Sequence, residues 1–124
     1  MNILIADQNP GFRNAIRQLL QGGEVEEVWE AADGEEAVAL AREFQPDLVL
    51  MEMTLPRVSG LEATAMIKKT GKNVQIVIMA EQTEPVYRLA ALRSGADAFI
   101  PKVSAWASLV PEVPQKAVRR AGAS

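Results

Sequence analysis

The chain has 124 residues, of which 48% are hydrophobic and 23% charged, so we expect one globular domain over residues 1–124. The net charge of −3 does not favour nucleic acid or an anionic membrane as a partner, and the absence of Cys and His excludes disulfides, thiolate metal sites and His-dependent nucleophiles. No apolar run reaches the ~20 residues of a membrane span, and the N-terminus does not resemble a signal peptide, so we expect a cytoplasmic protein without membrane contact.

The first half of the chain alternates short apolar runs with segments of helical periodicity. NILIA at 2–6 predicts a strand, and VEEVWEA at 25–31 predicts a shorter and less buried one. Gly22 and Gly23 end the helix after the first strand, and Pro46 ends the helix after the second. The apolar positions of these helices are Phe12, Ile16, Leu19 and Leu20 in the first and Ala37, Leu40, Ala41 and Phe44 in the second.

The second half continues the alternation. DLVLM at 47–51, VQIVIMA at 74–80 and AFI at 98–100 predict three further strands. The uninterrupted apolar character of the first of these indicates a central parallel strand covered on both faces. Helices are expected at 61–71, 84–94 and 104–120.

The last predicted helix contains two prolines. Proline lacks an N–H and costs about 3 kcal/mol inside a helix. We therefore expect this helix to start near Ser104 and to break or shift between Pro111 and Pro114. Residues 115–124 are expected to form a linker or tail, whose basic residues are more typical of a solvated helix end than of a nucleic-acid contact.

Five successive βα units predict an α/β fold with a doubly wound parallel sheet and helices on both faces. Ligands of such sheets bind at the carboxyl ends of the strands. The polar pocket expected there contains two acids, Asp7 and Glu52, and one base, Lys102. Taken singly, Asp7 is a helix cap, Glu52 a solvated strand end and Lys102 a surface lysine. Their convergence instead favours a pocket in which Lys102 pairs with a carboxylate, because an unpaired buried charge is costly.

Four segments of the chain resemble the receiver domain of bacterial two-component response regulators. These segments are ILIADQNPGFR, AADGEEAVAL, PDLVLMEMTLPRVSGLEA and SGADAFIPK. The resemblance covers nearly the whole chain and implies the flavodoxin-like (βα)5 fold, with the strand order 2-1-3-4-5 taken from the family. It also implies a role in the signal transduction of a two-component phosphorelay, rather than enzymatic activity beyond residual phosphoryl transfer.

The resemblance implies a phosphorylation pocket that this chain has altered. Glu52 stands where the family has its phosphoacceptor Asp. Asp7 and Gln8 stand where two adjacent acids hold Mg²⁺, and the backbone carbonyl of Thr54 completes the metal site. The second acid of the metal site is therefore lost.

Three more positions follow from the resemblance. Ala80 stands where a Thr or Ser of the family hydrogen-bonds the phosphoryl group, Lys102 matches the family's Lys, and Phe99 matches its switch aromatic. Family members usually carry a Pro after the Lys, whereas here Pro101 precedes Lys102 and Val103 follows it.

The altered positions predict a pseudo-receiver that is not phosphorylated in the usual way and serves as a protein-interaction module. Gln8 removes a negative charge, Glu52 is a methylene longer than Asp, and Ala80 offers no donor. We expect no cofactor, with Mg²⁺ binding at Asp7, Glu52 and Thr54 weak or absent. The alternatives are a phosphoaccepting receiver that uses Glu52 with Mg²⁺ and a flavodoxin, which is disfavoured because the segment DQNPGFRN contains no Ser or Thr.

Glu52 is expected to lie within salt-bridge reach of Lys102, because Gln8 and Ala80 leave Lys102 no better anion. Glu52 is then a fixed charge that either mimics a phosphorylated Asp or only fills the pocket. The expected partners are a histidine kinase, an effector domain or a second receiver. A homodimer would use the face of the fourth helix, fifth strand and fifth helix, where Tyr87, Phe99 and Trp106 predict a contact surface.

Overall fold

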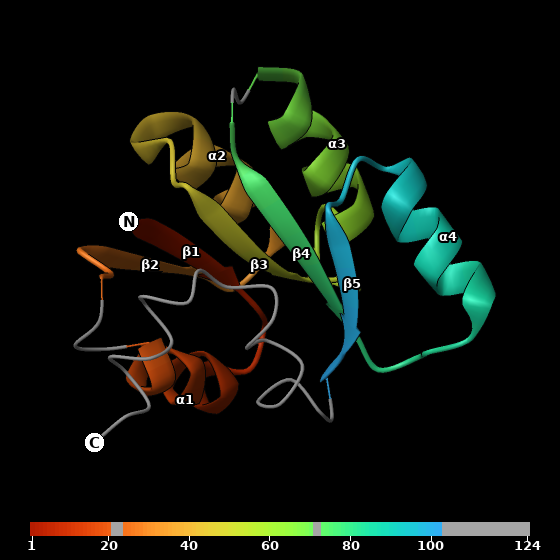
Figure 1. Cartoon of the computed structure of the whole chain (residues 1–124), viewed down its shortest axis with the longest axis horizontal. Helices are drawn as coiled ribbons and strands as arrows, with labels where there is room; N and C mark the ends of the chain where they lie inside the picture. The colour runs from red at the N-terminus through yellow and green to blue at the C-terminus, as the bar shows by residue number, and fades with distance from the viewer. Residues whose placement is uncertain (21–23, 71–72, 103–124) are drawn as a thin grey trace.

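The computed structural model describes residues 1–20, 24–70 and 73–102, and it shows one parallel sheet flanked by helices (Figure 1). The strands are β1 (Asn2–Ala6), β2 (Glu27–Ala31), β3 (Leu48–Glu52), β4 (Gln75–Ala80) and β5 (Ala98–Pro101). The helices are α1 (Pro10–Leu20), α2 (Gly34–Phe44), α3 (Gly60–Thr70) and α4 (Pro85–Arg93). The strand order is β2-β1-β3-β4-β5 with all neighbours parallel, which confirms the predicted fold and order.

The predicted elements agree with the structure to within about two residues at each end. The strand expected at 47–51 spans Leu48–Glu52, so Glu52 is its last residue and Asp47 remains in the preceding turn. Asp47 there accepts a hydrogen bond from the backbone N–H of Asn2 at 2.7 Å. The fifth helix expected over 104–120, its break at the prolines and the tail at 115–124 lie outside the described residues.

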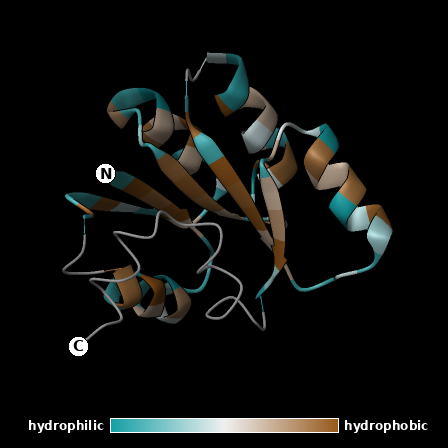
Figure 2. Ribbon diagram, viewed as in Figure 1, coloured by the Kyte–Doolittle hydropathy of each residue, from teal (hydrophilic) through white to brown (hydrophobic). Residues whose placement is uncertain are grey.

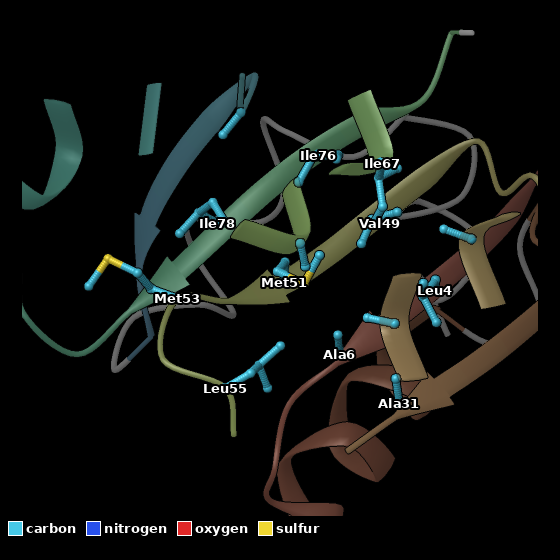
Figure 3. Packing of buried hydrophobic residues seen from close by; sticks show 14 of the residues in the cluster. Leu4, Ala6, Ala31, Val49, Met51, Met53, Leu55, Ile67, Ile76 and Ile78 are labelled. Carbon is cyan, nitrogen blue, oxygen red and sulfur yellow. The ribbon is translucent and has the colours of Figure 1, made fainter. Parts of the chain in front are cut away.

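Strands β1, β3, β4 and β5 are largely buried on both faces, because side chains alternate along each strand and helices cover both sides, whereas β2 is only partly buried. In β1, Ile3 and Ile5 pack under α1, while Leu4 and Ala6 face the opposite layer. That layer is built by α2, α3 and α4, as Figure 1 shows, and Figure 3 shows its core around Val49, Met51, Ile76 and Ile78. The hydropathy colouring of Figure 2 follows this arrangement, with the apolar residues concentrated in the central strands.

The loop between β3 and α3 is held close to the sheet by buried side chains and by a glycine. Met53 and Leu55, which are 5% and 7% exposed, continue the core beyond the end of β3 (Figure 3). Gly60 donates its N–H to the carbonyl of Met53 at 2.8 Å, and a Cβ at Gly60 would overlap the carbonyl oxygen of Glu52. Glycine is required at this position because the backbone of α3 approaches the end of β3 too closely for a side chain.

The start of β5 is fixed by Asp97. Its Oδ2 accepts hydrogen bonds from the N–H of Ile76 at 2.8 Å and from the Lys68 ammonium at 2.7 Å. These contacts tie β5 to β4 and to α3, and they set the register that delivers Lys102 to the other end of the strand.

None of the helices α1 to α4 is both long enough and apolar enough to span a membrane.

Candidate functional site

The three ionisable residues of the predicted pocket meet at the carboxyl edge of the sheet. Asp7 directly follows β1, Glu52 ends β3, and Lys102 directly follows β5. Asp7 is fully buried and Glu52 is 5% exposed, so both carboxylates lie below the protein surface. The parallel topology brings these residues together, although Lys102 is 95 positions from Asp7 in the sequence.

Lys102 bridges both carboxylates. Its Nζ lies 3.3 Å from Glu52 Oε2, which confirms the predicted salt-bridge reach. Asp7 is the nearer anion, with Oδ2 at 2.8 Å and Oδ1, which accepts the hydrogen bond, at 3.1 Å. The expectation that Lys102 has no better anion than Glu52 is therefore wrong, because β1 and β3 are neighbours and present their acids at the same edge.

The ammonium of Lys102 is held in its charged form. Burial alone would lower the pKa of Lys102, but the hydrogen bond and charge of Asp7, followed by the charge and hydrogen bond of Glu52, outweigh burial and raise the pKa. The Phe12 ring adds a cation–π contact, with its centroid 4.6 Å from Nζ. The chain thus supplies its own fixed cation to the pocket.

Gln8 connects the segment that follows β1 to the segment that follows β3, beside the ion pairs of Lys102. Its backbone N–H donates to Glu52 Oε1 at 3.0 Å, and its side-chain amide donates to the carbonyl of Thr54 at 3.1 Å. Both carboxylate oxygens of Glu52 are therefore engaged, one by Gln8 and the other by Lys102. Asp7 Oδ1 also accepts the N–H of Asn9 at 2.8 Å, which orders the chain ahead of α1.

Arg13, Arg17 and Glu30 form a second group of charges next to Asp7. Arg13 donates to the carbonyl of Asp7 at 2.6 Å, and the Nε atoms of Arg13 and Arg17 each donate to one oxygen of Glu30 at 2.8 Å. Burial would raise the pKa of Glu30, but the hydrogen bonds and charges of the two arginines outweigh it and lower the pKa. Sequence reasoning missed this group, although the i, i+4 spacing of the arginines on α1 was a usable signal.

A family model of the response regulator receiver domain matches residues 3–113. The chain belongs to this family. The receiver fold agrees with the observed strand order.

Relatives and solved structures agree with this assignment. The chemotaxis protein CheY of Halobacterium salinarum is 34% identical, with 81% of this chain and 82% of that protein covered. The nitrate/nitrite response regulator protein NarL of Escherichia coli K12 is 30% identical over 98% of this chain but only 54% of its own length. A LuxR-family two-component response regulator from Aurantimonas sp. SI85-9A1 superposes with a TM-score of 0.81 at 35% identity, covering 89% of this chain and 79% of the other. The receiver thus spans about half the length of NarL.

Phe99 of this receiver is buried rather than exposed. It is 6% exposed and packs into the core shared with α3 and α4, so the prediction of a contact surface containing Phe99 is wrong. Side-chain alternation in β5 directs Phe99 to the face covered by α3 and α4. Arg88 of α4 donates to the Phe99 carbonyl at 3.3 Å, and its guanidinium carbon lies over the ring, 6.0 Å from the centroid. Tyr87 is half-buried against the same core, and Trp106 lies outside the described residues.

The exposed part of the α4 face is aliphatic. Val86, Leu89 and Leu92 are 65%, 48% and 43% exposed, and their spacing places them along one slanted stripe of the helix. The stripe follows an acidic segment with Glu84 and precedes Arg93. An apolar stripe with opposite charges at its two ends is suited to protein contact.

Ala80 ends β4 beside the pocket and is 2% exposed. Because alanine has no hydroxyl, no such group reaches the site from this strand.

A cavity of about 330 Å³ lies elsewhere, between the carboxyl-terminal ends of α2 and α3, with Arg42, Asp47 and Asn73 in its wall. It opens at the amino ends of the strands and is unrelated to the predicted site. Within the described ranges, Asp, Glu, His and Cys residues do not form a cluster of three or more that could hold a metal ion.

Proposed function

We propose that this receiver is a cytoplasmic protein-interaction module of a two-component system whose pocket is not phosphorylated in the usual way. The observation that carries the proposal is the engagement of Glu52, whose two oxygens contact the Gln8 N–H and the Lys102 ammonium. A carboxylate used in this way is poorly placed as a nucleophile, since phosphoryl transfer depends on an aligned attacking oxygen. Ala80 offers no donor to a transferred phosphoryl group.

Phosphorylation by acetyl phosphate tests this proposal. We expect no shifted band for the wild-type receiver on a Phos-tag gel after incubation with acetyl phosphate and Mg²⁺. The matched control is the triple variant Gln8→Asp, Glu52→Asp, Ala80→Thr, which restores the family pattern and should give a shifted band. A shifted wild-type band that disappears in Glu52→Gln would instead establish the alternative, a receiver that phosphorylates Glu52.

Receiver domains interact with kinases and effector domains, and we propose that this one also binds a second copy of itself through α4. Two α4 helices packed antiparallel about Leu89 would set Val86 of one copy against Leu92 of the other. The same arrangement brings the acidic start of one helix, at Glu84, toward Arg93 of the other. The exposed apolar stripe and the charges at its ends therefore favour a symmetric pair.

The substitution Leu89→Lys should weaken self-association by about tenfold or more, because it places a charge at the centre of the apolar contact. Sedimentation equilibrium over a concentration series measures the effect. Met66→Lys on α3 is the control, since Met66 is also partly exposed, at 36%, but lies on another helix. A wild-type receiver that stays monomeric at the highest concentration would exclude the homodimer.

A further inference from the structure

Gln8 and Lys102 together contact every group that the resemblance assigns to a metal ion. Lys102 lies within 3.3 Å of both Asp7 and Glu52. The Gln8 side-chain amide donates to the remaining group, the carbonyl of Thr54, at 3.1 Å. The oxygens that would coordinate Mg²⁺ thus already accept hydrogen bonds or ion-pair contacts from within the chain, and this arrangement does not fit the ion.

The charges around the pocket are already balanced. The connected set consists of three carboxylates, in Asp7, Glu52 and Glu30, and three cations, in Lys102, Arg13 and Arg17. A divalent cation added to this set would leave two positive charges uncompensated beside a carboxylate with no solvent exposure. Mg²⁺ also prefers several hard oxygen ligands in near-octahedral geometry, and one acid of the family's site is missing here.

We propose that Gln8 is a positioning residue that, together with Lys102, replaces the bound cation. Its amide ties the segment after β1 to the segment after β3. Lys102 balances one of the two negative charges of Asp7 and Glu52, and the neighbouring group of two arginines and Glu30 supplies the other positive charge, so the pocket stays closed in one state that does not depend on metal. This inference rests on the proposed function, because a phosphorylated pocket requires the cation that Gln8 and Lys102 displace.

Two substitutions at Gln8 distinguish the effect of its hydrogen bond to Thr54 from the effect of the negative charge that the family carries at this position. Gln8→Ala frees the Thr54 carbonyl without adding a ligand. Gln8→Asp frees the carbonyl and adds a carboxylate beside Asp7. Gln8 is exposed at the pocket rim, so both variants should fold.

Isothermal titration with MgCl₂ measures the effect on metal binding. We expect wild type to show no sub-millimolar binding and Gln8→Asp to bind Mg²⁺ at least about tenfold more tightly. Gln18→Asp adds the same charge on an exposed position of α1 and should leave Mg²⁺ binding as in wild type. Gln8→Ala should speed amide hydrogen exchange at residues 8–9 and 53–55 while leaving the rest of the sheet unchanged.

The results separate this inference from the proposed function. Sub-millimolar Mg²⁺ binding by wild type that is lost in Asp7→Ala would overturn the inference, as would a Gln8→Asp variant without increased affinity or a Gln8→Ala variant with unchanged exchange. Wild-type phosphorylation would overturn the proposed function whatever the titrations give. A phosphorylation-silent wild type with an unresponsive Gln8→Asp variant would retain the function and reject the role of Gln8.

Discussion

Replacing Lys102 with Met should destabilise this receiver by about 3–5 kcal/mol, because the substitution leaves two buried carboxylates without their cation. Asp7 has no solvent exposure and Glu52 only 5%, so water cannot take over the role of the ammonium. Glu52→Gln should be milder, since the amide oxygen can still accept the Gln8 N–H and one negative charge is removed. Urea unfolding monitored by circular dichroism gives the free energies of unfolding.

Double-mutant cycles assign this loss to particular pairs. Because Lys102 is closer to Asp7, at 2.8 Å, than to Glu52, at 3.3 Å, the coupling of Lys102→Met with Asp7→Asn should exceed its coupling with Glu52→Gln. The control is Lys69→Met, which removes an exposed lysine of α3. Coupling energies indistinguishable from zero in both cycles would show that the ion cluster does not hold the pocket together.

The pH dependence of this stabilisation follows from the pKa of Lys102. Since that pKa is raised in the folded state, the contribution of Lys102 is fully present below the unfolded value of ~10.4 and is lost only as the pH rises through the higher folded value. Lys102 therefore supports the wild-type fold throughout the neutral range.

Gly60→Ala should cost about 3 kcal/mol, because the new methyl group would overlap backbone rather than a movable side chain. The nearest atoms are the carbonyl oxygen of Glu52 and, at 2.9 Å, that of Met53. Relief requires α3 to move away from the end of β3, which would also break the hydrogen bond from Gly60 to Met53. Urea unfolding again measures the loss.

Gly11→Ala is the matched control for this substitution. A Cβ at Gly11 would meet only the side-chain oxygen of Asn9, at 3.2 Å, on the surface near the start of α1. We expect its effect to stay within about 1 kcal/mol, since alanine is the better helix former. Equal effects of the two substitutions would contradict the close approach of α3 to β3.

The sequence predicted the fold well because the central strands β1, β3 and β4 are marked by nearly continuous apolar runs. NILIA and LVLM can be covered only by helices on both faces, and the alternation of elements then requires a parallel sheet. The same topology brought Asp7, Glu52 and Lys102 together without knowledge of side-chain positions. The ends of the strands were harder to predict. Including or excluding one terminal residue, such as Asp47 or Glu52, changes the hydrophobic pattern of a strand little.

Details that depend on side-chain reach were not predictable. The preference of Lys102 for Asp7 over Glu52 is decided by differences of about half an ångström between distances of 2.8 and 3.3 Å. The orientation of Phe99 could not be read from AFI, since three residues are too few to establish which face of a strand is buried. The contact of Gln8 with Thr54 crosses 46 positions of sequence and leaves no local pattern.

The ion cluster also has a consequence for how the chain folds. Lys102 reaches Asp7 across 95 positions and Glu52 across 50, so these pairs close some of the longest loops in the described chain. Such contacts become favourable only after pairing of the intervening strands has already lowered the entropy cost of closing the loop. We therefore expect the pocket to assemble late, after β5 has joined the sheet, so that the ion pairs of Lys102 stabilise the sheet only once β1, β3 and β5 are all in place.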